Sequence, residues 1–199
     1  MNYTQLKTAI QDYTQSSETS FVTNIDTFIT QAENRLFFDI DVPDFHKNVT
    51  GTMTQNNTFL QKPEDLFKVY SLAVIKTGNV YSYMLPKDVS FIREAFPDAD
   101  DSGLPTHYGN FDDEFFIVGP VPDDDYSVEL HYKFQPDALS STNANSWFGD
   151  NAEAALLYAT LVEAYTYLKG EQDIMSFYGE RYSSALQALQ NYGAAEVNM

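Results

Sequence analysis

The hydrophobic positions of this chain follow a helical period at both ends and a strand-like alternation in the middle. Residues three or four apart are apolar in four stretches, a spacing that predicts amphipathic helices. Because an apolar stripe needs a partner surface, we expect both ends to pack together and the middle to emerge as an insertion. The four stripes are Tyr3, Leu6, Ile10 and Tyr13; Ile25, Phe28, Ile29, Ala32 and Leu36; Leu156, Ala159, Val162 and Leu168; and Ile174, Phe177, Tyr178, Tyr182, Ala185 and Leu189.

Polar clusters and proline set the expected limits of the two N-terminal helices. The first is predicted over residues 2–14, and the polar run 15–20 ends it and offers capping oxygens to the next. The second is predicted to start between Ser20 and Asn24 and to continue to about Phe38. Pro43 rules out any further helical continuation.

Capping residues also frame the C-terminal helices. Asp150 and Glu153 have the spacing of a capping box, and Gly170 stands where a glycine often ends a helix. A last helix is predicted to end near residue 191, with Gly193 beyond it. Residues 194–199 are expected to lack structure unless a partner orders them.

Between the helices, alternating residues and turn dipeptides predict strands. The first two strands are expected to pair as a hairpin around residues 55–57. The next two are expected to pair around Gly78-Asn79, where both residues tolerate positive φ. Asp88 is expected to cap a short helix that ends before Pro97. The predicted strands are Phe45 to Thr54, Thr58 to Gln61, Leu66 to Lys76, Val80 to Leu85, Thr106 to Phe111, Glu114 to Val118 and Tyr126 to Phe134.

These elements predict an α+β fold. Its core is a helical bundle formed by the N- and C-terminal helices, over residues 1–42 and 146–199. An antiparallel β sub-domain, residues 43–145, is inserted into the bundle. The Ser-, Asn-, Thr- and Ala-rich segment 136–145 is the best candidate for a hinge.

Composition narrows the possible functions. The chain has 199 residues and a formal net charge of −18, which leaves no electrostatic route to tight binding of nucleic acid. There are no cysteines, so disulfides and thiolate metal sites are excluded. The first residues lack the basic flank and apolar core of a signal peptide, and no apolar run is long enough to span a membrane. We therefore expect a protein that is cytosolic, or is assembled from the cytosol, and has no membrane contact.

No catalytic constellation is evident. His46, His107 and His131 show no ligand spacing, and no serine lies in a nucleophile-elbow pattern. Three acidic clusters, at 98–101, 112–114 and 123–125, fall at predicted turns, where Asp is favoured for local hydrogen bonding. None of them matches the EF-hand calcium pattern. We expect no catalytic residues, no metal site and no cofactor.

Aromatic residues make up 15% of the chain and suit both sheet faces and wet interfaces. The series in the middle is interpreted as core and interface rather than as a platform for stacking sugars. A glycan-binding or glycan-cleaving module remains the alternative from a different class. That alternative predicts retention on a glycan array and loss of binding when exposed tyrosines become alanine. The residues of the series are Tyr81, Tyr83, Phe91, Phe96, Tyr108, Phe111, Phe115 and Phe116.

An ordered series of short motifs resembles a known family. The motifs include residues 3–6, 10–14, 19–22 and 31–36, then Leu85-Pro86-Lys87-Asp88-Val89-Ser90-Phe91-Ile92-Arg93-Glu94-Ala95-Phe96-Pro97, Gly119-Pro120-Val121-Pro122-Asp123 and Val128-Glu129-Leu130-His131-Tyr132, and at the back residues 155–159, 162–165, 168–171 and 178–182. In this order and spacing the chain resembles the head-to-tail adaptor proteins of short-tailed phages, the group related to tail tubular protein A. The resemblance covers residues 3 to about 191.

The resemblance implies a structural virion protein without catalytic residues. It implies a ring, expected to be a dodecamer, between the portal protein and the tail nozzle protein. DNA would pass through its channel without specific binding, and the C-terminal segment 192–199 is a candidate arm toward the portal. The location implied is the virion neck or tail, with the host cytoplasm as the site of assembly. Another neck or tail-completion protein is the nearest alternative.

Overall fold

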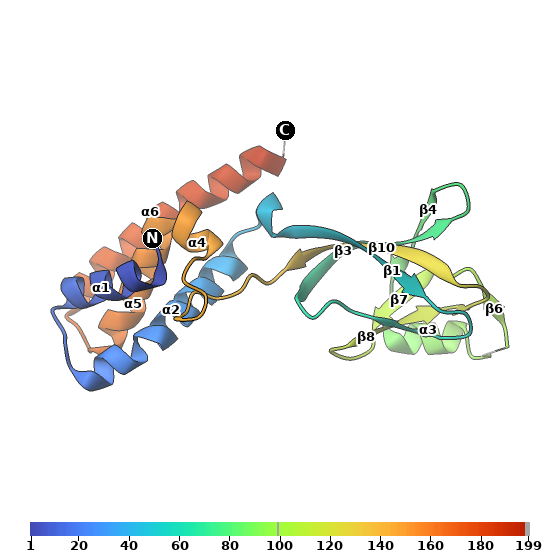
Figure 1. Ribbon diagram of the computed structural model, residues 1–199, viewed down its shortest axis with the longest axis horizontal. Helices are drawn as coiled ribbons and strands as arrows, with labels where there is room; N and C mark the ends of the chain where they lie inside the picture. Colours follow the sequence, from blue (N-terminus) through green and yellow to red (C-terminus); the bar gives the residue numbers. More distant parts are fainter. Residues whose placement is uncertain (99, 198–199) are drawn as a thin grey trace. The chain divides into compact units, whose positions relative to one another are not determined.

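The chain folds as a mixed α and β protein with antiparallel sheets, and its residues separate into two compact units. The computed structural model describes residues 1–98 and 100–197, and the side chains of 194–197 are outside that description. The helical unit comprises Met1–Asp44 and Pro136–Met199, and the β unit comprises Phe45–Gln135. Both ends of the chain therefore belong to the same unit (Figure 1).

The helical unit is organised around α5, Glu153–Tyr167, which packs against α1, α2 and α6. Buried residues lie on several sides of α5, and many of them are alanine, so neighbouring helices approach closely. The α2 stripe is buried as its periodicity predicts, including Ile25 and Ile29, and so are Leu6 and Ile10 of α1, but Tyr13, the last residue of the α1 stripe, is 49% exposed. The remaining helices of this unit are α1 (Tyr3–Thr14), α2 (Thr19–Asp39), α4 (Trp147–Asn151) and α6 (Gln172–Val197).

The β unit contains two four-stranded sheets and one short strand pair. The first sheet has the order β1-β10-β3-β4, with β1 His46–Met53, β10 Tyr126–Phe134, β3 Leu66–Lys76 and β4 Val80–Tyr83. The second has the order β2-β8-β7-β5, with β2 Phe59–Gln61, β8 Phe115–Gly119, β7 His107–Asn110 and β5 Leu85–Pro86. Short parallel pairings join β5 to β7 and β6 (Ser102–Gly103) to β9 (Val121–Pro122).

A single apolar core holds the β unit together. It includes Leu72, Val74, Val128 and Leu130 from the first sheet and Phe116 from the second, so the two sheets bury their inner faces together. The helix α3, Val89–Ala95, packs on β7 and β8. The alternation expected for Tyr126 to Phe134 is confirmed from Tyr126 to Tyr132, where Val128, Leu130 and Tyr132 are buried between more exposed residues, but it ends there because Lys133 is buried as well.

One expected hairpin forms and the other does not. The β3–β4 hairpin turns at Gly78 (φ 84°) and Asn79 (φ 58°), as the dipeptide predicts. The expected pairing of the first two strands is wrong: β1 pairs with β10, and β2 pairs with β8 in the other sheet. Residues 54–58 thus connect two sheets, because each strand buries its apolar face better against a distant strand.

Three expectations about the C-terminal helices are also wrong. The capping box of Asp150 and Glu153 does not form: Asp150 lies inside α4, and the N-cap of α5 is Ala152, which makes no side-chain capping hydrogen bond. The N-cap of α4 is Ser146, which accepts a hydrogen bond from the Gly149 amide at 3.2 Å. Near the end of α5 the left-handed residue is Lys169 (φ 53°) rather than Gly170. The helix α6 continues through Gly193 to Val197, so most of the tail expected to be unstructured is helical. Residues 198 and 199, the end of the candidate arm, lie outside the described residues.

The segment expected to act as a hinge is tied to the helical unit. Leu139 is buried, and the backbone amide of Tyr3 donates a hydrogen bond to the carbonyl oxygen of Ala144 at 2.9 Å. Ser140 and Asn143 close a local turn within the segment. Several polar residues of the segment 136–145 therefore form hydrogen bonds within the helical unit, and its role as a hinge stays a prediction.

Candidate interaction surfaces

Each of the three histidines packs against aromatic rings. His46 and His131 contact Tyr70 on the first sheet, where the Tyr70 hydroxyl and His46 Nε2 are 2.9 Å apart. His107 packs against Phe91 and Phe96 of the α3 region. Across the residues that the structure describes, no group of three or more histidine and acidic side chains is arranged to hold a metal ion. The geometry offers aromatic packing at these positions.

The three acidic clusters are exposed turns whose carboxylates often accept local hydrogen bonds. Asp112 accepts from the amides of Glu114 and Phe115, at 2.9 and 2.7 Å. Asp123 accepts from the Tyr126 hydroxyl at 2.6 Å, and this bond raises the pKa of Tyr126 to about 12. Asp98 accepts from the Asp100 amide in the same manner. These contacts match the sequence interpretation of turn residues in contact with solvent.

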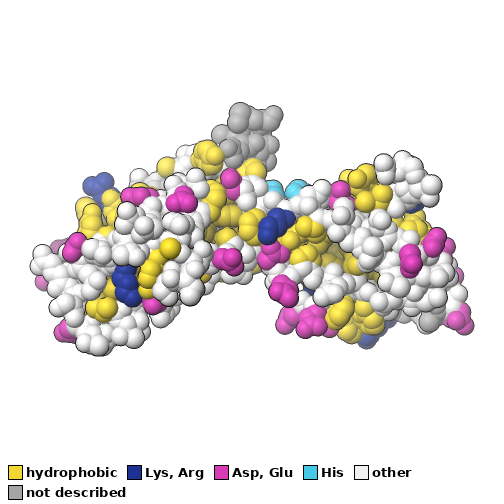
Figure 2. Space-filling model, viewed as in Figure 1, with side chains coloured by type: hydrophobic (Ala, Val, Ile, Leu, Met, Phe, Trp, Pro, Cys, Tyr) yellow, Lys and Arg dark blue, Asp and Glu magenta, His cyan; other side chains and the backbone are white. Residues whose placement is uncertain are grey.

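Exposed aromatic side chains gather on the β unit. Tyr81 and Tyr83 project from the edge strand β4, 43% and 64% exposed, with ring centroids 6.5 Å apart. Phe59 and Phe111 form a second exposed pair, 4.9 Å apart. Tyr108 and Phe116, by contrast, belong to the core. Figure 2 shows hydrophobic side chains over this unit, with acidic side chains around them.

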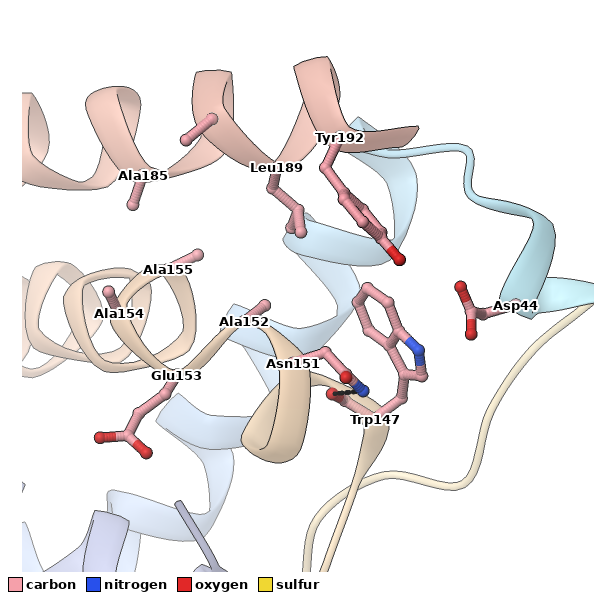
Figure 3. A pocket seen from close by; sticks show the side chains of 11 residues that line it. Asp44, Trp147, Asn151, Ala152, Glu153, Ala154, Ala155, Ala185, Leu189 and Tyr192 are labelled. Carbon is pink, nitrogen blue, oxygen red and sulfur yellow. Dashed lines mark hydrogen bonds between the residues drawn. The ribbon is translucent and has the colours of Figure 1, made fainter. Parts of the chain in front are cut away.

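A groove of about 520 Å³ lies on the helical unit between α4, α5 and α6. Alanine side chains line most of its length. Trp147, Leu189 and Tyr192 lie at one end, with Asp44 beside them (Figure 3). The Asn151 side chain donates a hydrogen bond to the carbonyl oxygen of Trp147 at 3.1 Å, which holds the end of α4 in place.

Glu33 is a buried carboxylate that the sequence did not single out. It accepts hydrogen bonds from the Leu139 amide at 2.7 Å and from the Ser146 hydroxyl at 2.6 Å. Burial raises the pKa of Glu33, and the two hydrogen bonds oppose that shift. Glu33 thus fastens the segment that returns from the β unit to α2. The only sequence signal is its place on the apolar face of the second helix stripe.

A second polar cluster joins α2, α5 and α6. Arg35 forms an ion pair with Glu163 and lies over the Tyr182 ring. The Tyr182 hydroxyl donates to Asp39 at 3.0 Å, and burial together with this bond raises the pKa of Tyr182. These contacts fix the relative register of three helices in the helical unit.

The surface features described are exposed aromatic pairs and acidic turns on the β unit and an alanine-lined groove on the helical unit. Within the described ranges, none of the helices combines the length and the hydropathy needed to cross a lipid bilayer.

A comparison with known protein families identifies the family of the chain. The family model described as SU10 adaptor protein matches residues 1–198. The chain therefore belongs to the SU10 adaptor protein family, a family of phage head-to-tail adaptors, and the resemblance noted in the sequence is confirmed. No curated protein sequence matches the chain. Membership implies a structural role in the virion neck, with portal and tail proteins as partners.

Proposed function

We propose that this protein forms a twelve-membered ring between the portal protein and the tail nozzle protein, with a central channel for DNA. In this proposal the helical unit is a bundle and the β unit is an inserted sub-domain, near the expected limits of 1–42 with 146–199 and 43–145. The ring assembles in the host cytoplasm and remains in the neck of the virion. It performs no catalysis.

The observation that carries the proposal is the family match, which extends over residues 1–198. Two features of the chain support it. Exposed aromatic side chains on the β unit supply area for contacts with other proteins. Repeated head-to-tail contacts between identical subunits close into a ring when the rotation between neighbours permits.

The net charge of −18 supports a channel that does not retain DNA. Carboxylates facing a passing duplex repel its phosphates, the reverse of the basic surface that nucleic-acid binders present. We assign this role to the acidic clusters at 98–101 and 123–125. Both contain exposed aspartates next to the β6–β9 pair.

Cryo-electron microscopy of the protein mixed with its portal protein tests the proposal. The expected result is a ring of twelve copies beneath the portal, and the nozzle protein should then bind to the opposite side of the ring. Particles lacking the protein should fail to join capsid to tail. Normal joining of capsid and tail in its absence would contradict the proposal, as would turnover of a polysaccharide by the purified chain.

A further inference from the structure

The first sheet of the β unit has two open edges. Its order is β1-β10-β3-β4, so β1 and β4 each have a sheet neighbour on one side only. Figure 1 shows β4 standing out from the unit as part of a hairpin. An uncovered edge presents backbone N–H and C=O groups that can pair with a strand of another chain.

Few charged residues protect these two edges: β4 has none and β1 has one. β4 is Val80-Tyr81-Ser82-Tyr83, without a charged residue, and Val80 is 52% exposed. In β1 the only charged side chain, Lys47, lies near the start of the strand and is engaged with Asp65 at 2.6 Å. The remaining six residues of β1, from Asn48 to Met53, are uncharged.

The distribution of acidic residues favours a second copy as the partner. Residues 45–87, which include both edges, contain only two acidic residues, Glu64 and Asp65, although the whole chain has 29. Residues 88–125 contain eleven acidic residues and one arginine. Copies that each carry a net charge of −18 repel one another. β1 and β4 contain no acidic residue, so a contact between these two strands brings no carboxylate of either strand close to the other copy.

A groove runs along the β1 edge. It has a volume of about 310 Å³, and β1 and β2 form its sides. Its lining includes the core residues Leu72, Phe116 and Leu130, so the space between the two sheets is open here. Ser82 pairs with the buried Val74, so its side chain and that of Val80 point toward the inner face of the sheet. A strand added at β1 would place such small and apolar side chains over the groove.

The directions of β1 and β4 permit them to pair between neighbouring copies. The four strands are antiparallel to their neighbours, so β1 and β4 run in opposite directions. If the ring axis is roughly parallel to the strands, rotation from one copy to the next leaves the strand directions unchanged. The β4 strand of one copy then runs antiparallel to the β1 strand of the next copy. We propose that β4 of each subunit pairs with β1 of its neighbour, so that the sheet continues from copy to copy. This inference rests on the proposed ring and specifies its lateral contact.

Cysteine cross-linking tests the contact, because the natural chain contains no cysteine. Ser82→Cys is nearly isosteric, and at Gly51 an added Cβ meets nothing nearer than Val128 Cγ2 at 3.6 Å. In portal-bound rings, a mixture of S82C and G51C subunits should form disulfide-linked dimers, and the S82C/G51C double variant should form a ladder of linked copies. S82C with S184C, an exposed position on α6, is the matched control and should not link. Because pairing can shift by two residues, V49C replaces G51C in a second arm.

A charge placed on the edge gives an independent test. Ser82→Lys should lower ring occupancy on the portal at least tenfold, whereas Thr77→Lys in the turn of the same hairpin should leave it unchanged. Circular dichroism checks that both variants fold. The contact would be wrong, although the ring proposal would hold, if S82K still formed rings and S82C formed no cross-link with either G51C or V49C. S82C linking to itself, or S82K losing only nozzle or DNA binding, would also overturn it. If the natural protein forms no ring on its portal, the proposed function and this inference fall together.

Discussion

At the residue scale, Glu33 shows how one buried carboxylate fixes a connecting segment. The segment 136–146 has little apolar surface of its own and is held by hydrogen bonds to α2 and to the start of α1. A buried donor that loses its acceptor costs more than the bond itself contributed, because its water is not restored. The segment is therefore sensitive to the identity of this single side chain.

Replacing Glu33 by alanine should lower the free energy of unfolding by about 2–4 kcal/mol, because the Leu139 amide and the Ser146 hydroxyl lose their acceptor. Chemical denaturation at neutral pH measures the change. Glu33→Gln keeps an acceptor for one donor and should cost less than half as much. Hydrogen exchange should show faster exchange of the Leu139 amide in E33A. An E33A protein as stable as the natural chain would contradict the assignment.

Because of Glu33, the free energy of unfolding should also depend on pH, and the direction of that dependence follows from the shift of its pKa. Burial raises its pKa above the ordinary value of 4.5, so the folded state binds the proton more tightly than the unfolded state does. The part of its contribution that is linked to proton binding is therefore complete below pH 4.5 and is lost as the pH rises through the raised pKa, whereas the two hydrogen bonds it accepts remain at neutral pH. Denaturation midpoints measured across this range should fall with pH in the natural chain relative to E33Q.

At the element scale, the sequence predicted where elements lie better than how they pair. The strands Leu66–Lys76 and Tyr126–Phe134 begin and end as predicted, because alternation and turn residues are local signals. The partner of β1 was not predictable in this way, since its pairing with β10 depends on burial across the 72 intervening residues 54–125. The sequence also did not predict the two grooves or the role of Glu33, because each of them depends on residues far apart in the chain.

Gly193 has a different role in the structure from the one its position in the sequence predicted. Its position suggested a helix end, yet it lies inside α6, where an added Cβ would come within 2.9 Å of Val42 Cγ1 and 3.0 Å of the Asp41 carbonyl oxygen. Glycine is needed there because the chain before Pro43 passes against the helix. Gly179 lies in the same helix, with nothing within 4 Å of an added Cβ.

These two glycines make a matched pair for substitution. Gly193→Ala should destabilise the protein by about 1–3 kcal/mol, because backbone and side-chain atoms must shift to admit the methyl group. Gly179→Ala should stabilise it by about 0.5–1 kcal/mol, because alanine restricts the unfolded chain and favours helix. Thermal unfolding of both variants measures the difference. Equal effects of the two substitutions would show that α6 does not pack on residues 41 and 42 in solution.

At the scale of the whole molecule, the charge distribution has a consequence for DNA passage. Changing the aspartates at 98–101 and 123–125 to asparagine removes six negative charges per copy. If these turns face the channel, DNA should leave the capsid more slowly, and the delay should shrink at high salt as the remaining electrostatic contacts are screened. Ejection measured from purified virions tests this. Changing the cluster at 112–114 in the same way serves as the control, and unchanged ejection in the first variant would contradict the channel assignment.

The two units should also respond separately to destabilising changes, because each has its own core. Trp147 is the only tryptophan and belongs to the helical unit, so its fluorescence reports on that unit alone. In E33A the fluorescence transition should move to lower denaturant, while hydrogen exchange in β3 and β10 changes little. Equal shifts of both signals would show that the units unfold as one.

The division of the chain has a last consequence, during synthesis on the ribosome. Every strand of the β unit has been translated once residue 135 is made, so that unit can fold while later residues are still emerging. The helical unit cannot close until α5 and α6 have followed, since α5 is the helix against which its other helices pack. An adaptor built this way exposes its finished sheet edges to neighbouring nascent chains before its helices are complete.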